Sequence, residues 1–205
     1  MTTLETSDNR IAAEMGLRKL AAGNQRFMEG KANFPTVCKE TLADLAREQK
    51  PFATILGCSD SRVPPELIFD ANFCELFIVR VAGNVVSPEV MGSLQYAGAH
   101  LRTPLFIVLG HAGCGAVKAA LEHKLNGVQH RSRIQILVNN ILPGLPAFGA
   151  KLSEEERLAS AIEANVRWSM HQILETPEAQ EAVKTGSKLV GGVFDFATGK
   201  VRFLD

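Results

Sequence analysis

The chain has 205 residues, a length that suits one domain, and 46% of them are hydrophobic, which is enough for a single sizeable core. Lysine and arginine together number 22, and so do aspartate and glutamate, so no net charge would attract nucleic acid or an acidic membrane surface. A short basic stretch around His130, Arg131 and Arg133 has no interleaved aromatic residues, and we interpret it as a solvated helix face.

Neither a secretory nor a membrane protein is indicated by the apolar runs of the chain. The best of them, Leu105 to Leu109, has the length of a strand, and the polar N-terminus lacks the regions that make a signal peptide. We therefore expect a cytoplasmic protein, unless a leader has been removed. The four cysteines are Cys38, Cys58, Cys74 and Cys114. In the cytoplasm we expect them to be free thiols or metal ligands and not to form disulfides.

The first 50 or so residues show helical patterns. Apolar residues recur at helical spacing from Asn9 to Met28, with Ser7 or Asp8 as the N-cap and Gly30 as the stop. A second, shorter helix is expected from Thr41 to Glu48.

The rest of the chain alternates between strand and helix patterns. Strands are expected in three short apolar runs, Phe52–Gly57, Leu76–Val81 and Leu105–Gly110. Helices are expected at Pro88–Leu101, at Cys114–Leu125 and, opened by a Ser-x-x-Glu capping box, at Ser153–Glu175. Residues 188–204 alternate around a turn at 197–200, which indicates a hairpin or a pair of edge strands.

This order of elements predicts an α/β fold. Strand, crossover helix and strand in succession give a central, mainly parallel β-sheet flanked by helices. We expect a single domain over residues 1–205, in which residues from about 1 to 48 form an N-terminal helical arm and the C-terminal strands lie at the edge. In such a sheet the functional groups gather where the strands end.

Two short motifs follow predicted strands. The sequence Cys-Ser-Asp-Ser-Arg occupies residues 58–62, and His-Ala-Gly-Cys occupies residues 111–114. Because the carboxyl ends of parallel strands meet at one crevice, the two motifs can supply ligands to one metal ion. Two thiolates and one imidazole suit zinc, and a set of three leaves one tetrahedral position for water, as catalytic zinc sites do. Cys114 also falls at a helix N-terminus, which lowers the pKa of a thiol.

Taken singly, each of these residues has a simpler interpretation. A cysteine at the end of a strand is more often a small buried hydrophobic residue, Asp60 could be a turn residue that bonds its own backbone, and Arg62 could be a surface charge. The glycine-rich turn at 110–115 lacks the spacing of a dinucleotide-binding or phosphate-binding loop. The two motifs together favour the metal site. Cys38 and Cys74 have no partner motif and are interpreted as core or surface thiols.

At these motifs the chain resembles the β-class carbonic anhydrases, and the resemblance covers nearly its whole length. The matching stretches are Ala22–Phe27, Gly57–Val63, Phe77–Asn84 and Gly110–Gly115. The resemblance implies one Zn²⁺ per subunit, held by Cys58, His111 and Cys114. It implies a catalytic dyad of Asp60 and Arg62. It also implies a substrate pocket shared across a dimer interface and formed by Gln49, Phe77, Ala82 and Tyr96.

The implied activity is the reversible hydration of carbon dioxide to bicarbonate and a proton, by attack of a zinc-bound hydroxide on CO₂. Asp60 would accept a hydrogen bond from the hydroxide, and Arg62 would hold Asp60 ionised and away from the metal. At low pH Asp60 is a possible fourth ligand. His123 and His130 are candidate proton shuttles. The expected partners are CO₂ or bicarbonate and further copies of the chain, in a homodimer or homotetramer, with no nucleic acid and no membrane.

Two other functions stay open at this point. One is hydrolysis of CS₂ or COS, which resemble CO₂ in shape, at the same site. The other is a non-catalytic zinc or redox-sensing module, in which the cysteines only hold metal. The pairing of an acid with a base beside the cysteines argues against the second alternative, because a structural metal site has no use for it.

Overall fold

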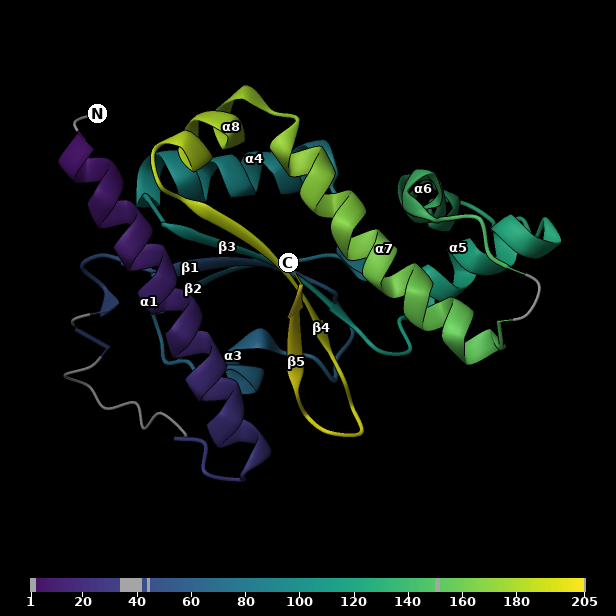
Figure 1. The fold of residues 1–205 in the computed structure, drawn as a ribbon, viewed down its shortest axis with the longest axis horizontal. Coiled ribbons are helices and arrows are strands. Elements are labelled where there is room, and N and C mark those ends of the chain that lie inside the picture. Colours follow the sequence, from purple (N-terminus) through teal and green to yellow (C-terminus); the bar gives the residue numbers. More distant parts are fainter. Residues whose placement is uncertain (1–2, 34–41, 44, 150–151, 205) are drawn as a thin grey trace.

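A five-stranded sheet forms the centre of the computed structural model, which describes residues 3–33, 42–43, 45–149 and 152–204. In spatial order the strands are β2 (Leu76–Arg80), β1 (Ala53–Gly57), β3 (Leu105–His111), β4 (Lys188–Phe194) and β5 (Val201–Leu204). The pairs β1–β2, β1–β3 and β3–β4 are parallel, and β4–β5 is antiparallel. Helices flank this sheet (Figure 1), so the predicted α/β fold is confirmed. The C-terminal hairpin is also confirmed, although β5 alone lies at the edge and β4 lies between β3 and β5.

The helices of the described residues lie before, between and after these strands. They are α1 (Thr3–Met28), α3 (Pro65–Ile68), α4 (Pro88–Tyr96), α5 (Gly115–Asn126), α6 (Ile134–Ile141), α7 (Glu154–Leu174) and α8 (Pro177–Lys184). Short turns of 3₁₀ or wider helix are η1 (Ala82–Asn84), η2 (Ala97–Leu101) and η3 (Leu142–Gly144). None of the helices in these ranges is long and apolar enough to cross a membrane.

Several helix boundaries differ from the prediction. Helix α1 starts before Ser7 and Asp8, so neither residue is its cap; its early turns are supported instead by the segment after α8, where Thr185 accepts a hydrogen bond from Asn9. The helix expected up to Leu101 changes at residue 97 into the wider turn η2, which ends at Arg102 in a left-handed conformation. Of the expected helix from Thr41 to Glu48, residues 42, 43 and 45 are helical, and 41 and 44 lie outside the described residues.

Other local predictions concern the end of α1, the start of α7 and the basic stretch at 130–133. Gly30 takes a positive φ just after α1, as expected of a helix stop. The capping box at the start of α7 is present, because Ser153 and Glu156 each accept a backbone hydrogen bond from the other. The basic stretch at 130–133, however, lies in the loop before α6 and not on a helix face. Helices α3, α6 and α8 were not predicted.

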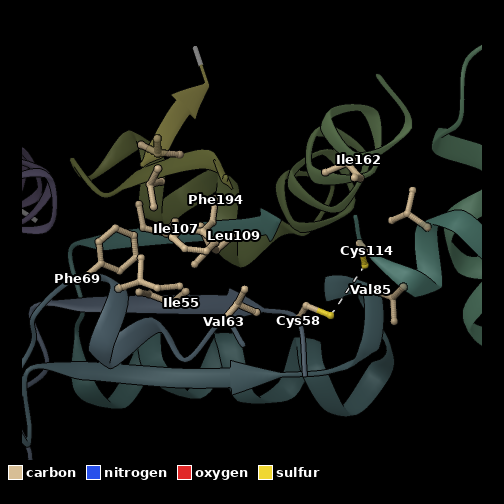
Figure 2. Packing of buried hydrophobic residues seen from close by; sticks show 14 of the residues in the cluster. Ile55, Cys58, Val63, Phe69, Val85, Ile107, Leu109, Cys114, Ile162 and Phe194 are labelled. Atoms are coloured by element: carbon tan, nitrogen blue, oxygen red, sulfur yellow. Dashed lines mark hydrogen bonds between the residues drawn. The ribbon is translucent and has the colours of Figure 1, made fainter. Parts of the chain in front are cut away.

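The core occupies both faces of the sheet, because successive residues of a strand point to opposite sides. Ile55 and Ile107 face one cluster, to which α1 and α3 contribute, and Figure 2 shows both beside Phe69. Leu56 and Val108 face a second cluster, built with α4, α7 and α8. Every residue of β1 is therefore buried, as a parallel sheet with helices on both faces requires. Helix α1 belongs to this packing, since its Ala13 and Leu20 are buried in the first cluster.

Candidate metal centre

Three ligand-bearing residues meet at the carboxyl ends of β1 and β3. The register aligns Gly57 with Leu109, so Cys58, one residue after β1, lies beside the end of β3, where His111 is the last residue. Cys114 is the N-cap of α5, and the turn after β3 returns it toward Cys58. Figure 2 shows the two sulfurs facing each other across the gap between these elements. One ligand atom from each of the three buried residues lies within 4.8 Å of the other two.

Two glycines make this arrangement possible. Gly110 packs against α7 so closely that a Cβ atom there would lie 2.6 Å from Val166 Cγ2. Gly113 has a φ of +64°, a left-handed conformation that brings the chain from β3 into α5. Larger residues at these positions would displace the strand end or the helix start, and with them His111 and Cys114.

The three side chains fit a tetrahedral zinc ion. The sulfurs of Cys58 and Cys114 are 4.0 Å apart, and two thiolates bound to one tetrahedral zinc would be about 3.8 Å apart. His111 donates from Nδ1 to the carbonyl oxygen of Ala112 at 2.9 Å, so Nε2 carries the free lone pair of the neutral ring. That Nε2 atom is buried and has no hydrogen-bond partner among the described residues, as expected of an atom that binds a metal.

Without metal, the three groups stabilise a thiolate at Cys58. Hydrogen bonding from Cys114 lowers the pKa of Cys58 to about 4, and His111 and the backbone amide of Gly83 act in the same direction. Hydrogen bonding to Cys58 and burial raise the pKa of Cys114, although backbone N–H groups of α5 lower it. The expected effect of the helix N-terminus is therefore present at Cys114, but the neighbouring thiolate outweighs it. Burial lowers the pKa of His111, but Cys58 outweighs that effect, so the net direction is upward.

A carboxylate with its own cation lies beside this cluster. Asp60 Oδ2 is 3.9 Å from His111 Nε2. Arg62 donates to both carboxylate oxygens, from Nε at 3.0 Å and from Nη2 at 2.8 Å, and its backbone N–H adds a third bond at 3.0 Å. The bonds from Arg62 hold the pKa of Asp60 well below its usual range. The predicted pairing of Asp60 with Arg62 is thus present, with the carboxylate ionised and turned to the guanidinium.

Two further residues at this site were not singled out by sequence reasoning. Arg80, at the end of β2, donates to the carbonyl oxygens of Cys58 at 2.8 Å and of Asp60 at 2.6 Å, and so fixes the loop that carries both. Arg80 could have been noticed as a charged residue that ends an apolar strand, within one of the stretches that match the family. Phe196, in the β4–β5 turn, lies under the Arg62 guanidinium at 4.3 Å and edge-on to His111. An aromatic residue in a hairpin turn gives no such signal.

The predicted substrate-pocket residues are not gathered at the metal cluster of one chain. Ala82 lies next to Gly83, whose amide contacts Cys58. Phe77 and Tyr96 contact each other, with ring centroids 6.2 Å apart, but Phe77 is level with Thr54, near the start of β1, and so is distant from the strand ends. Tyr96 is 47% exposed, and Gln49 is exposed as well.

Cys74, His123 and His130 do not belong to the cluster of ligand atoms. Cys74 is half-buried, with its sulfur 3.9 Å from the carbonyl oxygen of Glu48, and Cys38 lies outside the described residues. The two candidate proton shuttles contact backbone carbonyl oxygens, His123 that of Val128 and His130 that of Ala119.

Known proteins with similar sequences are carbonic anhydrases. The family model described as carbonic anhydrase matches residues 53–201. Carbonic anhydrase 2 of Mycobacterium tuberculosis is 41% identical over 137 residues, which cover 67% of this chain and 65% of that protein, slightly less than two thirds of its length. The carbonic anhydrase of Mycolicibacterium smegmatis is 34% identical over 197 residues, covering 95% of this chain and 93% of that protein.

Solved structures show the same similarity. A tetrameric β-carbonic anhydrase of the ascomycete Sordaria macrospora superposes with a TM-score of 0.72 at 26% identity, covering 80% of this chain and 85% of that one. The Coccomyxa β-carbonic anhydrase, solved with acetazolamide, gives a TM-score of 0.68 at 26% identity, with coverages of 92% and 81%. The chain belongs to the β-carbonic anhydrase family, and the resemblance noted in the sequence is confirmed.

Proposed function

We propose that this protein is a zinc enzyme that interconverts carbon dioxide and bicarbonate, with one Zn²⁺ per subunit held by Cys58, His111 and Cys114. The observation that carries the proposal is the buried cluster of three ligand atoms within 4.8 Å of one another, beside the paired Asp60 and Arg62. Family membership supports the same activity. A cytoplasmic location is part of the proposal, because thiol ligands stay reduced there.

The ligands and the dyad have separate roles in this proposal. Zinc, when bound, lowers the pKa of a water molecule so that a nucleophile is available near neutral pH. Asp60, kept ionised by Arg62, accepts a hydrogen bond from the attacking water and orients it toward the carbon of CO₂. Arg62 in turn is held between the carboxylate and the ring of Phe196, which keeps the carboxylate bound to the guanidinium and not free to become a metal ligand.

The substrate pocket, in our proposal, is completed by a second copy of the chain. Strand β2 lies at the edge of the sheet, and its residues Leu76 to Val79 are apolar and only half-buried. The unpaired backbone groups of an edge strand are a template for pairing with another chain. Dimerisation there would bury Phe77 and Tyr96 in the interface. With Gln49, they would then face the metal cluster of the other chain. Ala82 needs no such rearrangement, because it lies beside the metal cluster of its own chain. The similar Sordaria macrospora enzymes are tetrameric.

Replacing Asp60 by Asn tests the activity. In stopped-flow CO₂ hydration on protein of known zinc content, we expect D60N to retain zinc and to lose about 100-fold or more of its rate. The neutral amide accepts a weaker hydrogen bond from the attacking water than the carboxylate does, and its NH₂ group can only donate. Asp195→Asn is the matched control, since Asp195 also follows a strand and accepts hydrogen bonds from Thr198 in its own turn.

The outcomes of this experiment are distinct. Loss of rate in D60N alone supports the catalytic dyad. An undiminished rate in zinc-loaded D60N would contradict it, because Asp60 would then be a turn residue like Asp195. A wild-type protein that binds zinc but hydrates no CO₂ would contradict the activity itself, and turnover of CS₂ by that protein would point to the other hydrolytic function.

A further inference from the structure

The thiolate of Cys58 also accepts a hydrogen bond from outside the ligand cluster. The backbone N–H of Gly83 donates to its Sγ at 3.3 Å. Gly83 lies in the turn η1 with a φ of +73°, and Asn84 after it has a φ of +44°, so two successive residues are left-handed. Such a conformation persists only where surrounding groups hold it.

Helix α7 holds this turn through two buried side chains. Asn165 Nδ2 donates to the carbonyl oxygen of Gly83 at 2.8 Å, and Ser169 Oγ donates to that of Asn84 at 2.9 Å. Both side chains come from residues that are 1% exposed. Gly83 is thus held from two sides, its N–H by the sulfur of Cys58 and its C=O by the amide of Asn165.

Packing leaves Gly83 little freedom to find another orientation. A Cβ atom on it would lie 3.0 Å from Ala116 Cβ and 3.0 Å from Ile141 Cδ1, so the residue is enclosed by α5 and α6. The direction of its N–H therefore depends on the peptide group that Asn165 fixes.

Asn165 is poorly explained as a residue kept for stability alone. Its Oδ1 atom is buried and has no hydrogen-bond partner among the described residues, which is unfavourable. A leucine of similar shape would bury no polar atom. The use of an amide here is explained by its Nδ2 donor.

We propose that Asn165 is a positioning residue for the metal thiolate. By fixing the Gly83 carbonyl it directs the Gly83 N–H at Cys58, and that hydrogen bond withdraws electron density from the sulfur and limits the charge that Cys58 donates to a bound metal. The inference depends on the proposed function only in that Cys58 binds the metal.

The test uses Co²⁺ in place of zinc, because the thiolate-to-cobalt charge-transfer absorption reports the donor strength of the sulfur. Asn165→Leu removes the donor at nearly constant volume. Ser169→Ala is the matched control, since it removes an equally buried hydrogen bond from the same helix to the adjacent residue. We expect the absorption of N165L to shift to longer wavelength because the sulfur is then the stronger donor. Its zinc affinity in a chelator competition should nevertheless fall about tenfold or more, because the Gly83 N–H no longer holds the Cys58 sulfur in its binding position. S169A should match the wild type in both.

The results separate the possible explanations. An unshifted N165L spectrum, or an equal shift in S169A, would overturn the inference while leaving the proposed function intact. Thermal unfolding checks that N165L folds, and Asn165→Ala replaces it in the same measurement if it does not. Wild-type protein that takes up neither Co²⁺ nor Zn²⁺ would overturn both the inference and the proposed function.

Discussion

Asp70 joins the C-terminal part of α1 to the segment after α3. Its side chain is 2% exposed, pairs with Arg26 and accepts a bond from the backbone N–H of Asn33 at 2.6 Å. Burial raises the pKa of Asp70, but the hydrogen bonds from Arg26 and Asn33 outweigh it and hold the pKa below its ordinary value. The ionised form is therefore the one that stabilises the fold.

The sign of the pH dependence follows from this direction. A lowered folded-state pKa contributes stability above the unfolded pKa of about 4, and the contribution is lost as the pH falls through the folded-state value. Asp70→Asn, which keeps a residue tolerant of the φ of +46°, should cost about 1–2 kcal/mol at pH 7 in urea unfolding. The difference from the wild type should shrink below about pH 4.

A control variant separates this effect from general acid sensitivity. Asp8→Asn changes an exposed aspartate of α1 and should leave the unfolding free energy nearly unchanged at both pH values. A cost for D70N that stays constant from pH 7 to pH 3 would contradict the role of the ionised carboxylate.

At the level of single residues, the three metal ligands could be predicted from the sequence, but the residues that hold them in place could not. Cys58, His111 and Cys114 lie in short motifs at strand ends, so local sequence and parallel-sheet geometry were enough to bring them together. Asn165 and Phe196 reach the site from a distant helix and a hairpin turn. Their contacts depend on how α7 and β4 pack, which no spacing in the sequence encodes.

Among the elements, α1 approaches the backbone of a neighbour closely at Gly23. A Cβ atom on Gly23 would lie 1.8 Å from the carbonyl oxygen of Phe69, just after α3. Because the obstacle is backbone, it cannot rotate away, and Gly23→Ala must push α1 off the first core cluster. We expect a loss of about 3 kcal/mol or more in unfolding free energy.

Gly92 gives the matched comparison for this substitution. It also lies inside a helix, α4, but nothing lies within 4 Å of the Cβ position. Gly92→Ala should stabilise the protein by about 0.5–1 kcal/mol through helix propensity alone. Equal effects of the two substitutions in denaturant unfolding would show that propensity, not the α1–α3 approach, determines the cost at Gly23.

Long elements with strong patterns were predicted, and short or cooperative ones were not. The strands β1, β2 and β3 have apolar runs and α7 has a full capping box, so their sequences define them. Helix α3 has four residues, too few for a periodic pattern. The early start of α1 depends on Asn9 bonding Thr185, a contact between residues far apart in the chain.

For the molecule as a whole, the proposed sharing of the pocket predicts that two inactive variants rescue each other. Cys58→Ser removes a ligand but keeps Gln49 and Tyr96, whereas the double variant Gln49→Ala, Tyr96→Ala keeps the ligands. A dimer purified through different tags on the two chains should have one complete site of two, and hence about half of the wild-type rate.

Each variant purified alone is the control for this experiment. Both homo-oligomers should have little activity, and their mass by light scattering should match that of the mixed dimer. No rate above these controls in the mixed dimer would contradict a pocket built from two chains.

The overall architecture was predictable as a class but not in its strand order. Alternating strand and helix patterns indicate a parallel sheet, yet the position of β4 beside β3 depends on where the chain returns after α7 and α8. Equally, the apolar residues of β2 indicate a strand without showing that it lies at an edge. Both positions depend on contacts between segments that are far apart in the sequence.

The sulfurs of Cys58 and Cys114 are members of the same buried apolar cluster as Ile55 and Ile107. Without metal, the Cys58 thiolate still has the Cys114 sulfur and the Gly83 N–H as hydrogen-bond partners, so this part of the interior stays filled when a chelator has stripped the protein. We therefore expect the polypeptide to reach its mature shape before any ion arrives. For the proposed zinc enzyme, folding and metal binding are then separate steps, and protein made during a shortage of zinc would take up the ion later.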